Sequence, residues 1–180
     1  MRKIIAGLFV SVDGTVEFAN EFVGGYMDAE VGQDMGVLMT ERDAILLGAN
    51  TYREMAPHWP TQEGPLAAQM NETPKFVVSS TLDSVEGWQN STLISGDPLA
   101  ELTRLKQARG KNMQIVGSLT LTETLLRAGV VDELYMLVFP VVFGRGRRLF
   151  ERGGDPVALA LKECRAFSNG VVKNVYTQAG

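Results

Sequence analysis

Apolar residues along the chain occur either in short continuous runs or at spacings of three or four positions. Continuous runs bounded by turn residues are typical of buried strands, and here they predict strands at residues 3–10, 44–47, 75–78, 93–94 and 113–116. Helices are predicted between them, at residues 28–40, 51–55 and 98–108 and from the residue after Ser118 to Arg127. Residues 17–26, which include Gly24 and Gly25, are expected to form a loop. Strands that alternate with helices indicate a largely parallel central sheet.

The C-terminal part of the chain has a different pattern. A long apolar run at residues 134–142 is interrupted by Pro140, and two further runs follow at 158–167 and 171–177. The last two runs are separated by Ser168-Asn169-Gly170, and Asn-Gly between apolar segments is a strong hairpin signal. The expected fold class is therefore α/β, with a sheet that is parallel in the middle and antiparallel at its C-terminal edge.

Length and charge limit the classes of function. A chain of 180 residues is about the size of one domain, and we expect residues 1–180 to form a single domain. The 17 basic and 21 acidic residues give a net charge of −4, without the positive field that nucleic acids require. No apolar run approaches the roughly 20 residues of a membrane span, and the N-terminal run lacks a cleavage site. We expect a cytoplasmic protein that binds neither nucleic acid nor membranes.

The single cysteine, Cys164, cannot form an internal disulfide, which suits a reducing compartment. Because unpaired cysteines usually pack as small apolar residues, we expect Cys164 to be half-buried in a strand. The single histidine, His58, has no second histidine or cysteine cluster with which to bind a metal, so no metal site is expected. We expect His58 on a surface loop, and a hydrolase would instead need it in a cleft beside a serine.

Two strand-to-helix junctions are candidates for phosphate binding, because ligands of open α/β sheets bind outside the carboxyl ends of the strands. The first junction contains Gly48, Ala49 and Thr51, and the second contains Gly117, Ser118, Leu119 and Thr120. Unpaired N–H groups at a helix N-terminus attract phosphate, so two such junctions could hold a pyrophosphate. The alternative is ordinary helix capping by glycine and hydroxyl residues. Neither a G-x-G-x-x-G motif nor a P-loop is present.

Hydroxyl and carboxyl side chains supply the remaining candidates. Ser79, Ser80 and Thr81 follow another predicted strand and could contact a ribose or a 2′-phosphate, or form an ordinary turn. Asp13 ends the first strand and Asp28 begins the first helix. A partly buried carboxyl group with a raised pKa could supply a proton in catalysis. The alternative roles are a turn residue for Asp13 and a helix N-cap for Asp28.

Five segments together resemble the dihydrofolate-reductase-like superfamily. They are L-F-V-S-V-D-G at residues 8–14, D-A-I-L-L-G-A-N-T-Y at 43–52, K-F-V-V-S-S-T-L at 75–82, I-V-G-S-L-T-L-T-E-T-L-L-R-A-G-V-V-D-E-L at 115–134 and F-P-V-V-F-G-R-G-R-R-L-F at 139–150. The last two most resemble the branch that contains the RibD C-terminal domain, the riboflavin-pathway reductase. The resemblance covers almost the whole chain in order, and it implies a three-layer fold with helices on both faces of the sheet.

The resemblance also implies NADPH as the hydride donor and a homodimer. By position, the resemblance matches Gly48 and Thr51 to a phosphate-contacting turn, and residues 117–120 to the turn under the pyrophosphate. It matches Ser79-Ser80-Thr81 to the segment around the adenosine 2′-phosphate. It matches Asp13 to an aspartate close to the nicotinamide. Ala49 stands where many relatives have arginine, and Ser118 where many have a second glycine. Arginine is also missing from the Ser79–Thr81 segment. These departures leave the choice between NADPH and NADH open.

The expected function is hydride transfer from NAD(P)H to an electron-poor C=N or C=O group of a small heterocycle, as in 5-amino-6-(5-phosphoribosylamino)uracil reductase. Asp13 or Asp28 would orient the substrate or relay a proton, while the cofactor performs the hydride chemistry. A pterin or folate reductase and a nucleotide-binding dimer without turnover are alternatives, and a hydrolase based on His58 is a further one.

Overall fold

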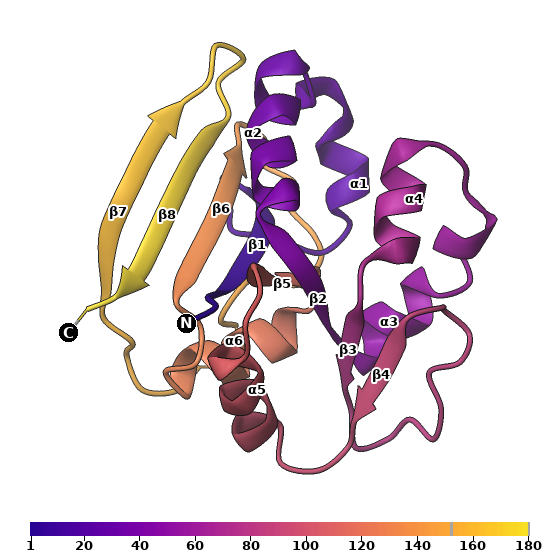
Figure 1. Ribbon diagram of the computed structural model, residues 1–180. Helices are drawn as coiled ribbons and strands as arrows, with labels where there is room; N and C mark the ends of the chain where they lie inside the picture. Colours follow the sequence, from indigo (N-terminus) through magenta and orange to yellow (C-terminus); the bar gives the residue numbers. More distant parts are fainter. Residues whose placement is uncertain (152, 180) are drawn as a thin grey trace.

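One sheet organises the protein in the computed structural model, which describes residues 1–151 and 153–179 (Figure 1). Within these residues the sheet has eight strands in the order β4-β3-β2-β5-β1-β6-β8-β7. The strands are β1 (Ile4–Ser11), β2 (Arg42–Gly48), β3 (Lys75–Val78), β4 (Ser91–Ile94), β5 (Asn112–Val116), β6 (Glu133–Phe139), β7 (Leu159–Ala166) and β8 (Val172–Gln178). Strands β1 to β6 pair in parallel, whereas β8 is antiparallel to both β6 and β7. The predicted parallel sheet with an antiparallel C-terminal hairpin is confirmed.

Helices cover both faces of this sheet (Figure 1). They are α1 (Ala19–Phe22), α2 (Ala29–Thr40), α3 (Ala49–Met55), α4 (Pro65–Glu72), α5 (Pro98–Gln107) and α6 (Leu119–Arg127), with 3-10 turns η1 (Gly24–Tyr26) and η2 (Trp59–Thr61). Side chains of α5 and α6, such as Leu102 and Leu125, share one core with Ile4 and Ile115 of the sheet. On the opposite face, helices α1 and α2 pack over β1 and β6, and α3 and α4 over β2 and β3. The result is the three-layer dihydrofolate-reductase-like fold that the resemblance implied.

The residues predicted to begin α2 and to form the hairpin turn do so in the structure. Asp28 is the N-cap of α2, and its carboxylate accepts a hydrogen bond from the Val31 N–H at 2.9 Å. In the hairpin turn, Gly170 has a φ of 88°, a left-handed conformation that glycine adopts at little cost. The Phe167 N–H then donates to the Val171 carbonyl oxygen at 2.8 Å, which closes the turn.

Four short elements differ from the prediction. Residues 17–26, expected as a loop, contain α1 and η1, and neither η2 nor α4 was predicted. Helix α4 buries only Ala67 and Met70, so its sequence carries little apolar periodicity, and it forms through packing on the rest of the chain. Strand β6 ends one residue before Pro140, which has no N–H to donate.

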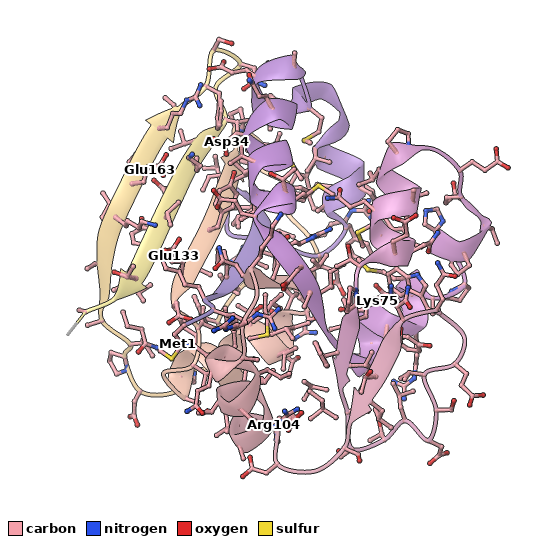
Figure 2. The ribbon with its side chains drawn as sticks, in the orientation of Figure 1. Met1, Asp34, Lys75, Arg104, Glu133 and Glu163 are labelled. Carbon is pink, nitrogen blue, oxygen red and sulfur yellow. The ribbon has the colours of Figure 1, made fainter. Side chains whose placement is uncertain are left out.

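The hairpin is attached to α2 by a largely buried ion pair of Asp34, which Figure 2 labels on α2. Asp34 of α2 accepts a hydrogen bond from the Lys173 ammonium group of β8 at 2.7 Å, and its other oxygen accepts the hydroxyl of Tyr135 in β6. The side chains of Asp34 and Lys173 are only 10% and 9% exposed. Lys173 also pairs with Glu163 of β7 at 2.6 Å, so one network joins α2 to three strands.

The outer strand β7 is open to solvent on both faces. Cys164 lies in this strand as predicted, but it is exposed and not half-buried. The reason is that β7 is the edge of the sheet and no helix packs over it, so even Leu161 is 58% exposed. Elsewhere in the described residues, no helix has the length and apolar character needed to cross a membrane. The same residues contain no cluster of three or more potential metal ligands.

Candidate functional site

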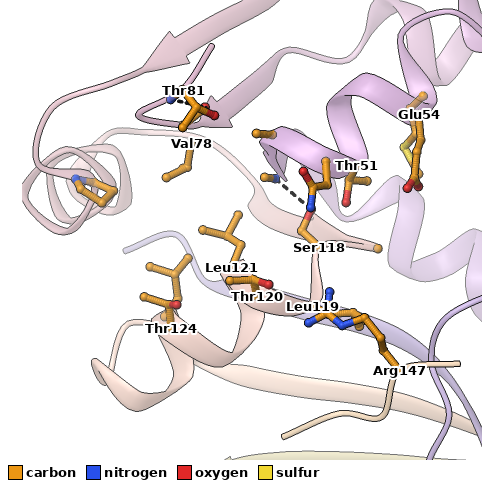
Figure 3. Close-up of a pocket in the computed structure, with 18 of the residues that line it drawn as sticks. Thr51, Glu54, Val78, Thr81, Ser118, Leu119, Thr120, Leu121, Thr124 and Arg147 are labelled. Carbon is orange, nitrogen blue, oxygen red and sulfur yellow. Dashed lines mark hydrogen bonds between the residues drawn. The ribbon is translucent and has the colours of Figure 1, made fainter. Parts of the chain in front are cut away.

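The carboxyl ends of β2, β3 and β5 open into one cavity of about 850 Å³ (Figure 3). The structure brings together in its lining every residue that the sequence predicted as cofactor-binding, namely Gly48, Ala49, Thr51, Ser79, Ser80, Thr81, Gly117, Ser118, Leu119 and Thr120. This convergence follows from the strand order, since β5 and β3 flank β2 on its two sides. Parallel strands present their carboxyl ends at the same edge of the sheet.

The two glycine-containing turns are joined directly by Ser118. Its hydroxyl oxygen accepts a hydrogen bond from the Gly48 N–H at 2.9 Å (Figure 3). The same hydroxyl donates to the Val116 carbonyl oxygen at 3.1 Å. Ser118 is only 4% exposed. It is also the residue before α6, but its side chain makes no cap there and leaves the first N–H groups of α6 without a hydrogen bond from their N-cap residue. Ser118, which stands where the resemblance implied a glycine, thus fastens the turn after β2 to the turn after β5.

Replacing Ser118 with alanine is expected to lower the free energy of unfolding by about 1–2 kcal/mol, because the Gly48 N–H loses its acceptor inside the fold. Urea denaturation followed by circular dichroism measures the change. Thr120→Ala is the matched control, since Thr120 is exposed on the same turn and such substitutions usually change stability by less than about 0.5 kcal/mol. Equal losses in the two variants would contradict the role of the Ser118 hydroxyl.

Gly117 occupies a position that other residues fit poorly. Its φ of 63° lies in the left-handed region, and a Cβ atom added there would lie 3.3 Å from the Thr51 Cγ2 atom. That distance is shorter than an ordinary van der Waals contact between carbon atoms. The turn after β5 therefore packs tightly on α3, which keeps the two turns at the cavity in a fixed relation.

The hydroxyl segment after β3 forms a turn and also lines the cavity. The Ser79 hydroxyl accepts hydrogen bonds from the N–H groups of Thr81 and Leu82, both at 3.0 Å. This is the turn-forming role that was the alternative at sequence level. The Thr81 hydroxyl accepts a further hydrogen bond from the Arg53 guanidinium at 3.3 Å, and Ser80 is exposed. The segment therefore presents hydroxyl groups to the cavity from a backbone that Ser79 holds in place.

Asp13, a predicted catalytic residue, does not line the cavity. Its carboxylate accepts hydrogen bonds from the Ser11 hydroxyl at 2.6 Å, the Phe143 N–H at 3.0 Å and the Gly144 N–H at 2.9 Å. The Ser11 hydroxyl, followed by these two backbone donors, lowers the pKa of Asp13 to about 2. The expectation of a raised pKa is wrong here, because the hydrogen bonds favour the charged form. Asp13 fastens the residues 143–144 to the end of β1.

Asp28, the second predicted catalytic residue, also lies outside the cavity lining. One carboxylate oxygen caps α2, and the other accepts a hydrogen bond from the Asn169 side-chain amide at 2.9 Å. Both oxygens are therefore engaged in structural contacts, in keeping with the N-cap alternative. His58 is likewise absent from the lining, and its exposed ring contacts the edge of Trp59 at a centroid distance of 5.3 Å. Within the described residues, His58 therefore does not share the cavity with the serines that line it, as a hydrolase at this site would require.

The cavity is also lined by charged residues that the sequence did not predict as site residues. Among the described lining residues, the carboxylates belong to Glu17 and Glu54, and the cation belongs to Arg147. The Glu17 carboxylate accepts a hydrogen bond from the Arg147 backbone N–H at 3.0 Å, and the Arg147 guanidinium contacts Glu151 at 3.1 Å. Residues 17 and 147 are far apart in sequence, so no local sequence pattern indicated that both line the same side of the cavity.

An aromatic side chain completes this side of the cavity. Phe18 lines the cavity, is 44% exposed and has a φ of 58°, which is unusual for a residue other than glycine. Gly146 approaches it so closely that an added Cβ atom would lie 3.1 Å from the Phe18 ring. Strained backbone of this kind is often found at ligand sites, and here it holds an exposed ring at the cavity.

Comparison with known proteins shows the family of the chain. Residues 2–173 match the RibD C-terminal domain. The chain belongs to the RibD C-terminal domain family. The resemblance drawn from the sequence segments is therefore confirmed at the level of family, over nearly the whole chain.

Relatives of this RibD C-terminal domain protein include the Bacillus subtilis (strain 168) protein YyaP, which is 30% identical over 97% of this chain and 94% of its own length. A solved structure from Shewanella sp. PV-4, whose name refers to riboflavin biosynthesis, has a TM-score of 0.80 at 19% identity and is covered over 99% of both chains. A Thermotoga maritima structure, named as a diaminohydroxyphosphoribosylaminopyrimidine deaminase/5-amino-6-(5-phosphoribosylamino)uracil reductase, has a TM-score of 0.69 at 13% identity. The match to that structure covers 99% of this chain but 57% of the other. At these identities the solved structures establish the shared fold.

Proposed function

We propose that this protein is an NADPH-dependent reductase that transfers hydride to an electron-poor C=N or C=O group of a small heterocycle. The observation that carries the proposal is the single cavity at the ends of three parallel strands, lined by all ten residues expected to bind the cofactor. Membership of the RibD C-terminal domain family supports the same reaction class.

The residues around the cavity fit a dinucleotide. Its volume of about 850 Å³ falls within the roughly 300–1,000 Å³ typical of ligand and cofactor sites. Helix α6 directs the uncapped N–H groups of its first turn at this region, and such groups attract phosphate. At Gly117 the absence of a side chain lets the backbone approach closely. Residues 117–120 would hold the pyrophosphate, and Ser79, Ser80 and Thr81 the adenosine ribose.

NADPH, when bound, supplies the hydride. The side chains of the protein then have to bind and orient the substrate and control its proton. Glu17 and Glu54 line the cavity and can accept hydrogen bonds from ring N–H or amino groups, a role for which Asp13 and Asp28 are poorly placed. The exposed ring of Phe18 offers a flat surface for a heterocycle. Asp13 would act indirectly, by keeping residues 143–144 against β1.

For the substrate, we propose a ribosylaminopyrimidine similar to 5-amino-6-(5-phosphoribosylamino)uracil, on the likeness to the Thermotoga maritima protein that carries this reductase name. A pterin or folate substrate and a nucleotide-binding dimer without turnover are the alternatives that the experiment must separate. The homodimer and the cytoplasmic location remain predictions from the sequence.

Thermal unfolding with NADPH, NADH, methotrexate and a ribosylaminopyrimidine tests the proposal. A ligand present at 100 times its Kd adds about 2.7 kcal/mol of stability, so NADPH is expected to raise the Tm by roughly 5–10 °C for a chain of this size. Oxidation of NADPH in the presence of the pyrimidine would establish turnover. A stabilising effect of methotrexate would favour the folate alternative, and nucleotide binding without oxidation would favour the non-catalytic dimer. If neither NADPH nor NADH raised the Tm, the proposal would be refuted.

A further inference from the structure

Arg53 brings a positive charge to the rim of the cavity next to the hydroxyl segment after β3. Its guanidinium donates hydrogen bonds to the Thr81 hydroxyl at 3.3 Å and to the Asn50 side-chain oxygen at 3.2 Å. Both acceptors line the cavity, although they come from different elements. The guanidinium therefore bridges α3 and the turn after β3 at the place where the Ser79–Thr81 segment meets the cavity.

The charge of Arg53 is not neutralised within the described part of the chain. None of the ion pairs found among the described residues includes Arg53. By contrast Arg147, the cation in the cavity lining, is paired with Glu151. A guanidinium has five N–H donors, and the two contacts of Arg53 are long and go to neutral oxygen atoms. Most of its capacity to bind an anion is therefore available.

The position of Arg53 on α3 also matters. It follows Ala49 by four residues, so the two side chains lie on the same face of the helix, one turn apart. Ala49 lines the cavity without charge, and the Ser79–Thr81 segment contains no cation. A long side chain from the next turn can bring a guanidinium back to the edge of the cavity that Ala49 leaves uncharged.

We propose that Arg53 selects NADPH over NADH by binding the 2′-phosphate of the adenosine ribose. The exposed Ser80 hydroxyl and the Thr81 hydroxyl would add neutral hydrogen bonds to the same phosphate. Charge-assisted hydrogen bonds from arginine to phosphate are stronger than neutral ones and can be bidentate. NADH carries only a hydroxyl group at that position, so its affinity should not depend on the charge of Arg53. This inference rests on the proposed function, because it assumes that a nicotinamide dinucleotide occupies the cavity.

Calorimetric titration of NADPH and NADH into the wild type, Arg53→Gln and Arg104→Gln tests the inference. Arg53 is exposed, so its replacement should leave the fold intact, which circular dichroism and the Tm verify. The expected result is a loss of NADPH affinity of about tenfold in Arg53→Gln, with the NADH affinity unchanged. Arg104→Gln is the matched control, since Arg104 is an exposed arginine on α5 paired with Glu101, and both affinities should stay at the wild-type values.

Salt provides a second readout. Because an exposed charge pair is screened by ions, the wild-type preference for NADPH should shrink as the NaCl concentration rises, and the preference of Arg53→Gln should change little. An unchanged ratio of NADPH to NADH affinity in Arg53→Gln would overturn the role of Arg53 while leaving the reductase proposal in place. Equal losses for both nucleotides would do the same. If the wild type bound neither nucleotide, the proposed function itself would fail, and this inference with it.

Discussion

Replacing Asp34 with alanine is expected to lower the free energy of unfolding by about 3 kcal/mol and to reduce the Tm by roughly 6–12 °C. Asp34 is the acceptor for both the Lys173 ammonium group and the Tyr135 hydroxyl, and its side chain is only 10% exposed. Removing it leaves a buried cation with less compensation and a buried hydroxyl without its acceptor. This loss of unfolding free energy lies at the lower end of the range for broken buried ion pairs, because Lys173 still forms its ion pair with Glu163.

Urea denaturation of Asp34→Ala measures this loss, with Glu101→Ala as the matched control. Glu101 forms an exposed pair with Arg104 on the surface of α5 (Figure 2), and such pairs contribute about 0.2–1 kcal/mol. Titration of Tyr135 gives an independent readout. Burial, followed by the hydrogen bond to Asp34, raises the pKa of this tyrosine. The pKa of Tyr135 should therefore be lower in Asp34→Ala than in the wild type. Comparable stability losses in the two variants would show that the buried network has no special role.

Replacing Gly117 with valine is expected to weaken NADPH binding by at least about 100-fold while the protein still folds. A β-branched residue is strongly disfavoured at a φ of 63°, and its Cβ atom would meet Thr51 at 3.3 Å. The turn must therefore shift relative to α3, and displacements of about 1 Å can cost about two orders of magnitude at a functional site. The strain itself should cost roughly 1–3 kcal/mol of stability. Calorimetric titration and circular dichroism measure the two effects separately.

Gly129→Val is the matched control for Gly117→Val. Gly129 has a φ of 74° and follows the opposite end of α6, where an added Cβ atom would make only an ordinary contact with Gln178 at 3.6 Å. It should show a similar strain cost with normal NADPH binding, since it does not line the cavity. Wild-type affinity in Gly117→Val, or an equal loss of affinity in Gly129→Val, would refute the claim that this turn holds the nucleotide.

Much of the fold could be predicted from the sequence because its signals are local. The strand at residues 75–78 has the predicted limits, and the Asn169-Gly170 turn forms the expected hairpin. Tertiary contacts decided the rest. Lys75, within an apolar run, is fully buried because its ammonium group donates to three carbonyl oxygens, two of them in the C-terminal part of α4, a helix that the sequence pattern did not reveal.

The candidate site likewise contains residues that could be predicted from the sequence and others that only tertiary contacts bring to it. Glycine and hydroxyl residues at strand ends are visible in the sequence, and all of them meet at one cavity. Asp13 and Asp28 were also visible, but a sequence does not show which donors a carboxylate will meet, and here backbone and amide groups occupy both. Glu17 and Arg147 share the site only because residues distant in sequence pack together, and Arg53 meets Thr81 for the same reason.

The strand order also bears on how the protein is made. Strand β5 lies between β1 and β2, although β1 to β4 all precede it in the chain. A nascent chain that ends before Asn112 therefore has a gap in place of a continuous sheet, because β1 lacks both of its neighbours, β5 and β6, and β2 lacks β5. At that stage the Gly48 N–H also has no Ser118 hydroxyl to bind. Insertion of residues 112–116 must close the gap late in synthesis, so the nucleotide cavity forms only after most of the polypeptide has left the ribosome.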